Sequence, residues 1–426
     1  MEYIPRIVDE QLAEYLQGTR AVSIEGPRAV GKTATASRVA KSKVRLDDPA
    51  TAAILGADRA GYLRSLDPPV LIDEWQLDPP VWDTVRRLVD DEPRPGRFIL
   101  TGSADLGDAR LHPGAARFLR LRMRPLSFAE RQLDEPTVSL AALWDGERDI
   151  GGHTPVTLRD YAEEIVASGF PAVRTEPASL RLDVIADYLE YAIAHDVPEL
   201  GGLHRQPAAV RAWLRPYAAA TSSTASLTSI AGAASREQLP SKATIAAFRD
   251  VLARLWLLDE LPAWSPAGTR LTQVMQSPKH HLADPAFAAS LLGTDADGLV
   301  LASGSGDVDA GLRKLRDGPM FGALFESLVT LSLRVYATAL RLEVRHLRTH
   351  RGDREIDLIL QGRDGRIIAV EVKLAPTADD RDVRHLHWLQ GRLGDQLIDR
   401  IVVSTGTTAY RRRDGVAVVP LALLGP

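Results

Sequence analysis

The sequence predicts a multidomain α/β protein, because strand and helix patterns alternate at both ends of the chain. Near the N-terminus, an apolar run leads into a glycine-rich octet at residues 26–33 and then into a helix-like stretch. Near the C-terminus, residues 354–360 and 367–373 have the pattern of two strands joined by an Asp364-Gly365 turn. The region between these two ends is mostly helical in pattern. With 426 residues, the chain is long enough for roughly two to four domains.

The octet fits the phosphate-binding pattern G-x-x-x-x-G-K-[ST] without a mismatch. Glycines at both ends of such a loop let the backbone wrap a phosphate, and the next helix adds its positive N-terminus. We expect Lys32 to reach the β- and γ-phosphates and Thr33 to ligate Mg²⁺. A chance glycine-rich turn would leave the second half of a nucleotide site missing. The predicted nucleotide-binding residues are Gly26, Pro27, Arg28, Ala29, Val30, Gly31, Lys32 and Thr33.

The second half of the nucleotide site is predicted at residues 70–74, an apolar run that ends in two carboxylates. It is typical of a buried parallel strand whose C-terminal end opens into a cleft. Asp73 is expected to hold Mg²⁺ through water, and Glu74 to orient or deprotonate the attacking water. The next apolar run ends in hydroxyl residues, so Thr101 or Ser103 could lie between the γ-phosphate and that water. Alone, the carboxylates would fit a solvated strand end; beside an intact phosphate loop, the metal-and-base interpretation is favoured.

Composition excludes several classes of protein. A hydrophobic content of 45% and a charged content of 25% are ordinary for a globular protein. No run approaches the ~18 consecutive apolar residues of a membrane span, and the N-terminus lacks the pattern of a secretory signal. The absence of cysteine excludes disulfides and thiolate metal sites. We therefore expect a cytoplasmic protein without membrane contact. A net charge of −4 argues against a protein that coats nucleic acid but allows a local basic groove.

The pattern along the chain predicts five segments. Within the third, three helix-like stretches precede a short strand at residues 258–264, the order of a winged helix. Its third helix would present Lys242, Thr244 and Arg249 outward, either toward a DNA major groove or as part of a protein-binding module. The segments are a nucleotide domain at 1–130, a loop and helical lid at 131–204, a winged-helix-like domain at 205–270, a linker at 271–318 and a C-terminal α/β domain at 319–426.

The C-terminal segment carries a second group of charged residues. Glu326 lies near the start of an apolar helical run, and the strand period of two places Glu355 with Asp357 and Glu371 with Lys373. Convergence of Glu355, Asp357, Glu371 and Lys373 in the middle of adjacent strands would suit Mg²⁺-dependent hydrolysis of a phosphodiester. A salt-bridge ladder, with Lys373 paired to Glu371 or Asp357, would give the same spacing. A basic approach for a nucleic-acid phosphate is suggested by Arg341, Arg345, His346, Arg348, His350, Arg351 and Arg354.

With these motifs in this order, the chain resembles a known family. It is similar to the bacterial and archaeal AAA-type ATPases that join an N-terminal P-loop module to a C-terminal domain of unknown function. That C-terminal domain resembles the PD-(D/E)XK restriction-endonuclease-like fold. The resemblance covers nearly the whole chain and rests on residues 26–33, 72–76, 100–103, 125–130, 169–171, 196–198, 283–285, 326, 355–357 and 371–373.

The resemblance implies an N-terminal AAA-type domain with a parallel sheet flanked by helices, which binds ATP and Mg²⁺. It implies that Ser103 senses the γ-phosphate. Arg117 stands where the family has an arginine before its Pro-Leu-Ser motif, but Ala116 replaces the usual glycine, so a cis sensor role and a trans finger role in a homo-oligomer both stay open. It further implies a nuclease-like set of Glu326, Asp357, Glu371 and Lys373, in which Asp357 and Glu371 ligate the metal.

Two functions follow as hypotheses. In the first, a Mg²⁺-dependent ATPase controls a nuclease-like C-terminal domain that acts on DNA. In the second, the nucleotide controls a switch whose C-terminal domain binds DNA or a protein without cleavage. The two differ at the C-terminal residues, because substitution of Asp357 or Lys373 eliminates DNA cleavage only under the first. A structural protein with a degenerate loop is disfavoured, since every expected ATP-site position is filled.

Overall fold

The computed structural model describes residues 3–103, 117–201, 207–234, 241–265, 277–302, 319–349 and 352–426. Much of the predicted linker, together with Ala116, His350 and Arg351, lies outside these residues. The chain divides into two compact units, which we describe separately. The first comprises Met1–Arg124, Phe170–Ala172 and Asp250–Leu257, and the second Pro125–Gly169, Val173–Arg249 and Leu258–Pro426.

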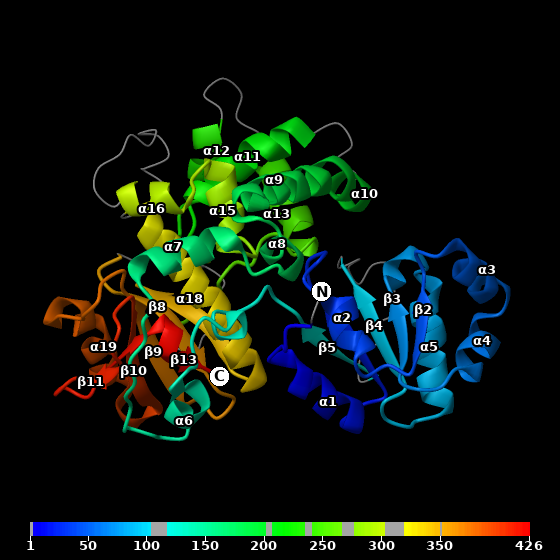
Figure 1. Cartoon of the computed structure of the whole chain (residues 1–426), viewed down its shortest axis with the longest axis horizontal. Helices are drawn as coiled ribbons and strands as arrows, with labels where there is room; N and C mark the ends of the chain where they lie inside the picture. Colours follow the sequence, from blue (N-terminus) through cyan, green and yellow to red (C-terminus); the bar gives the residue numbers. More distant parts are fainter. Residues whose placement is uncertain are drawn as a thin grey trace. The chain divides into compact units, whose positions relative to one another are not determined.

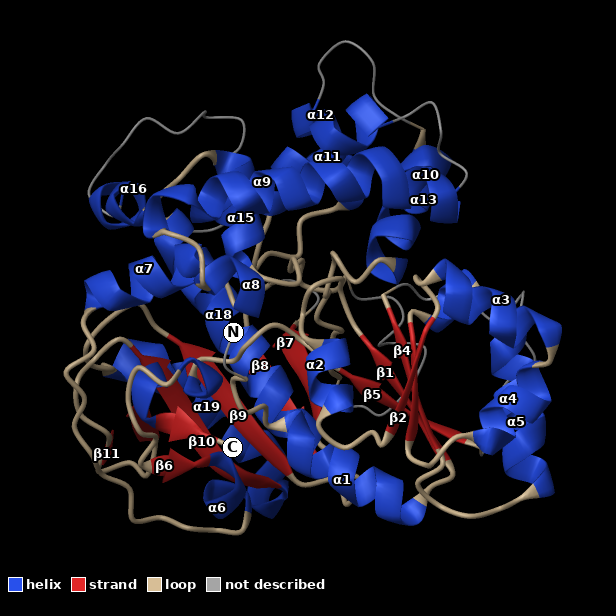
Figure 2. Cartoon of the chain, turned by 45° about the vertical axis from the view of Figure 1, so that its right-hand side comes forward, coloured by secondary structure: helices blue, strands red, loops and turns tan. Residues whose placement is uncertain are grey.

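The first unit is built on a five-stranded parallel sheet in the order β2-β3-β4-β1-β5 (Figure 1). Apolar runs form its central strands because helices cover both faces of such a sheet. Figure 2 shows α1 and α2 on one side and α3, α4 and α5 on the other. The strands are β1 Ala21–Glu25, β2 Ser42–Arg45, β3 Val70–Asp73, β4 Phe98–Gly102 and β5 Phe118–Arg122; the helices are α1 Val8–Gly18, α2 Lys32–Ser37, α3 Pro49–Ala57, α4 Arg59–Ser65 and α5 Pro80–Asp91.

The second unit contains a mixed six-stranded sheet in the order β11-β12-β10-β9-β8-β7. The predicted hairpin is confirmed: β8 and β9 pair antiparallel, and Gly365 adopts a φ of 83° in the turn between them. Beyond β9 the pairing becomes parallel, with β10 and then β12. The strands are β7 Glu343–Arg348, β8 Glu355–Gln361, β9 Ile367–Val372, β10 Leu397–Ser404, β11 Tyr410–Arg411 and β12 Ala417–Pro420.

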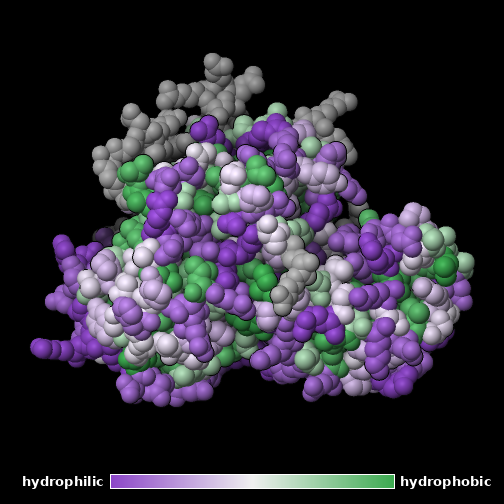
Figure 3. All heavy atoms as spheres, viewed as in Figure 1, coloured by the Kyte–Doolittle hydropathy of each residue, from purple (hydrophilic) through white to green (hydrophobic). Residues whose placement is uncertain are grey.

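Two long helices accompany this sheet, α18 (Met320–Ala339) and α19 (Asp380–Leu393). Helix α18 confirms the predicted apolar helix and contacts β7 and β8. Its length and composition would suffice for a membrane span, but 78% of the apolar window is buried within the structure, as in the core helix of a globular domain. Over the visible face of both units, hydrophilic and hydrophobic residues are interspersed (Figure 3).

Residues 131–155, the first part of the segment predicted as a loop and helical lid, pack against the C-terminal sheet. They contain β6 (Val138–Ser139), which pairs in parallel with β13 (Leu424–Gly425), and α6 (Leu140–Trp144), which contacts β10. Farther along, the backbone N–H of Thr154 donates to the carbonyl of Thr407 at 2.8 Å. The boundaries predicted after residues 204, 270 and 318 lie outside the described residues and stay predictions.

Helices form most of the rest of the second unit, and α8 and α13 also include residues that belong to the first. The three helices expected for a winged helix are present as α11, α12 and α13, whereas residues 258–264 do not form the regular strand that we predicted. Isolated antiparallel bridges instead join Leu258 to Leu282 and Leu261 to Lys279, which makes a short two-stranded ribbon. In chain order the helices are α7 Leu158–Ala167, α8 Pro171–Arg174, α9 Arg181–Tyr191, α10 Val197–Gly201, α11 Pro207–Ala219, α12 Leu227–Ala234, α13 Lys242–Arg254, α15 Pro285–Leu292 and α16 Ala296–Ala302.

The contacts of α13 qualify one expectation. The Arg249 side chain is 43% exposed, but its guanidinium is paired: its Nε lies 2.9 Å from both carboxylate oxygens of Glu260. Thr244 is partly buried and donates its backbone N–H to the Ser241 hydroxyl at 3.1 Å. Of the three predicted DNA-facing residues, Lys242 is the most exposed.

The buried carboxylate of Asp284 joins two motifs that lie 115 residues apart in the sequence. One of its oxygens accepts from the Gly169 backbone N–H at 2.6 Å and the Ser168 hydroxyl at 3.1 Å, while the other caps α15 by accepting from Ala286 N–H at 2.8 Å. Gly169 is required because a Cβ there would lie 2.8 Å from the backbone N and O of Leu126. This contact explains why these motifs occur together.

We predict that Asp284→Ala lowers the free energy of unfolding by about 3 kcal/mol, because it removes a helix cap and leaves buried donors unpaired. Chemical denaturation monitored by circular dichroism measures this change. Asp295→Ala is the matched control: Asp295 accepts from Gly298 N–H at 2.7 Å at the exposed start of α16. Equal losses from the two variants would contradict the joining role of Asp284.

Candidate functional site

The phosphate loop follows β1 at the C-terminal edge of the parallel sheet. Its backbone makes the tight turn that the octet predicts, with Ala29 at a φ of 64° and Gly31 at a φ of 107°. At Gly26 there is no room for a side chain, since a Cβ would lie 2.2 Å from the carbonyl oxygen of Met123. Helix α2 begins at Lys32, so its free N–H groups face the loop. The local sequence thus builds an anion-binding turn.

The Lys32 side chain is folded back into this turn. It is 4% exposed, and its Nζ donates to the carbonyl oxygens of Gly26 at 2.9 Å and Pro27 at 2.8 Å. Burial among these neutral acceptors lowers the pKa of Lys32 to about 8, although the nearby carboxylates of Glu74 and Asp73 oppose the shift. A phosphate would supply the negative charge that this ammonium lacks.

Thr33 and Asp73 lie together as predicted. The Thr33 hydroxyl donates to Asp73 Oδ1 at 2.8 Å, and the Thr101 hydroxyl donates to the same oxygen. The parallel order of β3 and β4 causes this convergence, because both strands end at one edge of the sheet. The donors are hard oxygen atoms of the kind that Mg²⁺ prefers, so this chemistry fits the predicted ion.

Two side chains hold Glu74 next to the Thr33–Asp73 pair. Its Oε2 accepts from the Ser103 hydroxyl at 3.1 Å and from the Gln76 amide, while Gln76 Nε2 also donates to Ser103 Oγ at 3.0 Å. Glu74 itself has a left-handed backbone with a φ of 55°, which turns the chain at the end of β3. Residue-by-residue reasoning did not assign a role to Gln76, although it lies in the motif at residues 72–76.

Arg6 supports the loop from behind and was also missed. Its buried guanidinium donates to the Val30 carbonyl at 3.0 Å and to the Arg124 carbonyl at 2.6 Å. Arg6 therefore ties the phosphate loop to the residue that ends the first unit. No local sequence pattern predicts this contact, because it joins positions 118 residues apart in the sequence.

The structure does not support Arg117 as a cis sensor. It precedes β5, and the register pairs Phe118 with Ala21, so Arg117 lies at the N-terminal edge of the sheet. The phosphate loop lies at the opposite edge. The Arg117 guanidinium instead contacts the Asp90 carboxylate at 2.7 and 2.9 Å. A role toward another chain would require Arg117 to leave this partner.

In the C-terminal unit, three carboxylates surround the ammonium of Lys279, a residue that the sequence analysis did not single out. Lys279 Nζ lies 2.9 Å from Glu326 Oε1, 3.0 Å from Glu355 Oε1 and 2.9 Å from Asp357 Oδ1, and the side chain is 1% exposed. The second oxygen of Asp357 accepts from the Val372 N–H at 2.9 Å. Glu326, which the resemblance groups with Asp357, thus lies with the β8 carboxylates around a lysine.

The other half of the predicted set lies next to this group. Lys373 Nζ contacts Glu371 Oε2 at 3.2 Å, which is the pair that the salt-bridge alternative expected. Extension of the β8–β9 register places Asp357 across from Glu371. Burial, reinforced by the charge of Asp357, raises the pKa of Glu371 well above its usual range.

Burial also raises the pKa of Glu326 to about 8, against the attraction of Lys279. For Asp357, burial is outweighed by Lys279 and Lys373, which hold its pKa at about 2. The pKa of Lys279 is raised well above its usual range because the three carboxylates overcome its burial. The group thus contains a permanently charged lysine beside an ionised aspartate.

These residues do not fit the Mg²⁺ that we predicted at Asp357 and Glu371. The ammonium occupies the position toward which the Asp357 carboxylate points, and Glu371 bonds to Lys373. Within the described ranges, no group of three or more His, Cys, Asp or Glu side chains is arranged to hold a metal ion. These contacts do not support the assignment of Asp357 and Glu371 as metal ligands, which stays a prediction.

The predicted basic approach to the cluster is also committed to internal contacts. Arg345 lies 2.8 Å from Glu343, and Arg348 lies 3.6 Å from Glu355. Burial lowers the pKa of His346 to about 3, which leaves its imidazole neutral. Arg345 and Arg348 are therefore already paired, and His346 is uncharged at neutral pH.

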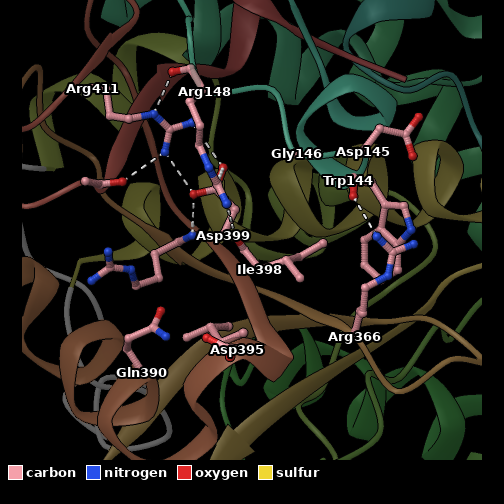
Figure 4. Close-up of a pocket in the computed structure, with 13 residues that line it drawn as sticks. Trp144, Asp145, Gly146, Arg148, Arg366, Gln390, Asp395, Ile398, Asp399 and Arg411 are labelled. Carbon is pink, nitrogen blue, oxygen red and sulfur yellow. Dashed lines mark hydrogen bonds and ion pairs between the residues drawn. The ribbon is translucent and has the colours of Figure 1, made fainter.

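A cavity of about 570 Å³ lies elsewhere in the second unit, beside β10 (Figure 4). Arg148 and Arg411 converge there on the buried carboxylate of Asp399, each at 2.9 Å. Across the cavity, the Arg366 guanidinium lies 5.0 Å from the centre of the Trp144 ring. Because Asp399 pairs with both Arg148 and Arg411, these salt bridges join the segment after α6 to the sheet.

Comparisons with known proteins match three parts of the chain. An AAA domain model matches residues 18–132, and two domains of unknown function, DUF8612 and DUF4143, match residues 158–298 and 321–424. No curated protein matches. A solved structure, the Walker-type ATPase PABY2304 of Pyrococcus abyssi, is 15% identical with a TM-score of 0.38, over 66% of this chain and 94% of that one. The AAA match supports an N-terminal P-loop ATPase domain, whereas the C-terminal matches assign no activity.

We predict that ATP binding takes up protons at pH 8–9. Free Lys32, with its pKa of about 8, loses its proton in this range, whereas bound phosphates would keep the ammonium charged. Affinity should therefore fall as the pH rises above 8, and up to about one proton should be taken up per ATP. Calorimetric titrations in buffers of different ionisation enthalpy measure this uptake.

Lys32→Arg is the matched control, because a guanidinium stays charged throughout this pH range. Residual binding by this variant should occur without the uptake. Equal proton uptake by the variant and by the unmodified chain would exclude Lys32 as its source.

Proposed function

We propose that the chain is a Mg²⁺-dependent ATPase whose nucleotide state controls a C-terminal domain that binds a partner without cleaving DNA. The observation that carries the ATPase part is the convergence of Lys32, Thr33, Asp73 and Glu74 at one edge of a parallel sheet. The matching AAA domain model, which spans residues 18–132, supports the same conclusion.

In this proposal, Lys32 exchanges partners when the triphosphate binds. Its ammonium leaves the two loop carbonyls and bonds to phosphate oxygens, which relieves the cost of burying a charge among neutral acceptors. Thr33 and Asp73 would hold Mg²⁺, which neutralises charge on the β- and γ-phosphates when bound. Asp73 keeps its orientation through Thr101.

Glu74 would orient the attacking water and accept its proton. In the structure its Oε2 accepts from Ser103 and Gln76. A γ-phosphate within reach of the Ser103 hydroxyl would compete for that hydrogen bond and leave Glu74 free to bind water. Ser103 and Gln76 would thus couple the arrival of the γ-phosphate to the availability of the base.

For the C-terminal domain, the contacts favour the non-cleaving hypothesis. The carboxylates that a nuclease would use for Mg²⁺ are bonded to Lys279, and the nearby arginines are paired. The three helices α11–α13 with the following ribbon support a winged-helix-like module. Because Arg249 is paired with Glu260, this module is better suited to a protein partner than to DNA.

We predict that Glu74→Gln retains ATP binding and lowers the rate of hydrolysis by about 10²–10⁴-fold, the contribution of a general base. Lys32→Ala should abolish turnover altogether. Phosphate release measured beside a nucleotide-binding assay separates the two effects. The control is Glu92→Gln, at an exposed glutamate of the same unit that pairs with Arg94. Unchanged hydrolysis by Glu74→Gln would remove Glu74 from the mechanism.

We also predict no cleavage of plasmid or single-stranded DNA by the purified chain, with Mg²⁺ or Mn²⁺ and with or without ATP. Asp357→Ala, run in parallel, should give the same result, since there is no cleavage to lose. Gel electrophoresis over a time course is sufficient. Cleavage that disappears in Asp357→Ala would restore the nuclease hypothesis.

A further inference from the structure

Carboxylates surround the Lys279 ammonium in the way that they surround a bound cation. Three carboxylate oxygens, from Glu326 on α18 and from Glu355 and Asp357 on β8, lie within 3.0 Å of its Nζ. These oxygens come from a helix and a strand that are both fixed by the core of the second unit. The lysine comes from a different part of the chain and completes the group.

The ribbon holds Lys279 rigidly in this position. Lys279 and Leu261 exchange two backbone hydrogen bonds of 3.0 and 2.9 Å. The same ribbon reaches β7, because Trp264 N–H donates to the His346 carbonyl at 2.6 Å and His346 N–H donates to Pro262 at 2.9 Å. The backbone of Lys279 is therefore set against the sheet independently of its side chain.

The distances distinguish an ammonium from a metal ion. Separations of 2.9–3.0 Å suit charge-assisted hydrogen bonds, whereas Mg²⁺ and Ca²⁺ take oxygen ligands at about 2.0–2.6 Å. The spacing of the carboxylate oxygens thus suits a lysine ammonium. If each oxygen moved less than ~1 Å toward the centre of the group, the spacing would suit a divalent ion.

A second observation points to an incomplete cation site. Glu371 is 5% exposed, and its Oε1 is buried without a hydrogen-bond partner. This carboxyl group faces the same region, because extension of the β8–β9 register places Glu371 across from Asp357. Leaving this buried oxygen without a hydrogen-bond partner costs free energy. The oxygen is therefore available to bind a cation of higher charge than an ammonium.

We propose that Glu326, Glu355 and Asp357 form a cation site whose occupant in this chain is the Lys279 ammonium, so that a neutral residue at position 279 converts it into a divalent metal site. The buried carboxylates cannot all stay ionised without a counter-charge. Once the ammonium is removed, a hard divalent cation such as Mn²⁺ is the ligand class that restores the balance. The inference concerns the second unit alone and does not depend on ATP hydrolysis.

The test is a Mn²⁺ titration of the full chain without nucleotide, followed by electron paramagnetic resonance of free Mn²⁺. Lys279→Ala should bind one additional equivalent per chain, at least about tenfold more tightly than the unmodified chain, because carboxylate charge sets the affinity. Adding Asp357→Asn to Lys279→Ala should remove that equivalent. Lys242→Ala, at an exposed lysine of the same unit, is the matched control and should bind as the unmodified chain does.

Lys279→Met preserves the buried stem of the side chain and guards against loss of the fold. Thermal unfolding with graded Mn²⁺ should show a rise in Tm for Lys279→Met that is absent in the unmodified chain. The proposal is overturned if folded Lys279→Ala and Lys279→Met bind no more Mn²⁺ than the unmodified chain. It is equally overturned if the unmodified chain binds Mn²⁺ at a site that Asp357→Asn removes.

Discussion

The structure depends on one constraint: a buried ammonium must have a complete set of acceptors. Two lysines satisfy it in different ways. Lys32 has only the neutral carbonyls of Gly26 and Pro27, and burial lowers its pKa to about 8. Lys279 has three carboxylates, which raise its pKa well above the usual range. An ammonium with weak acceptors can exchange them for a phosphate, whereas one with three carboxylates is a permanent part of the fold.

This difference assigns different roles to the two units. In the first, Lys32 is poised to bind an incoming triphosphate beside Asp73 and Glu74, whose positions are set by neighbouring parallel strands. In the second, Lys279 fastens a ribbon of the helical region to α18 and β8, so the acidic cluster serves the architecture. Under the proposed function, an ATP site in the first unit and carboxylates that are bonded to Lys279 in the second favour a switch over a nuclease.

Features that short sequence segments encode could be predicted, and those that depend on distant contacts could not. The phosphate loop, the carboxylates after β3 and the hairpin at Asp364-Gly365 each follow from a few adjacent residues, and all are present. Lys279 was missed because it lies 78 residues from Asp357 in the sequence, and the contact between them exists only in the folded chain. Arg117 was placed by family likeness, but strand order carries it to the edge of the sheet opposite the loop.

A crystal structure with Mn²⁺ and a non-hydrolysable ATP analogue tests the central claim most directly, because anomalous scattering locates the metal. The account predicts an anomalous peak beside Thr33 and Asp73, with Lys32 bonded to phosphate oxygens. It also predicts that Lys279 keeps its contacts with Glu326 and Asp357. A folded chain without nucleotide in the loop, or a manganese ion in the place of the Lys279 ammonium, would contradict it.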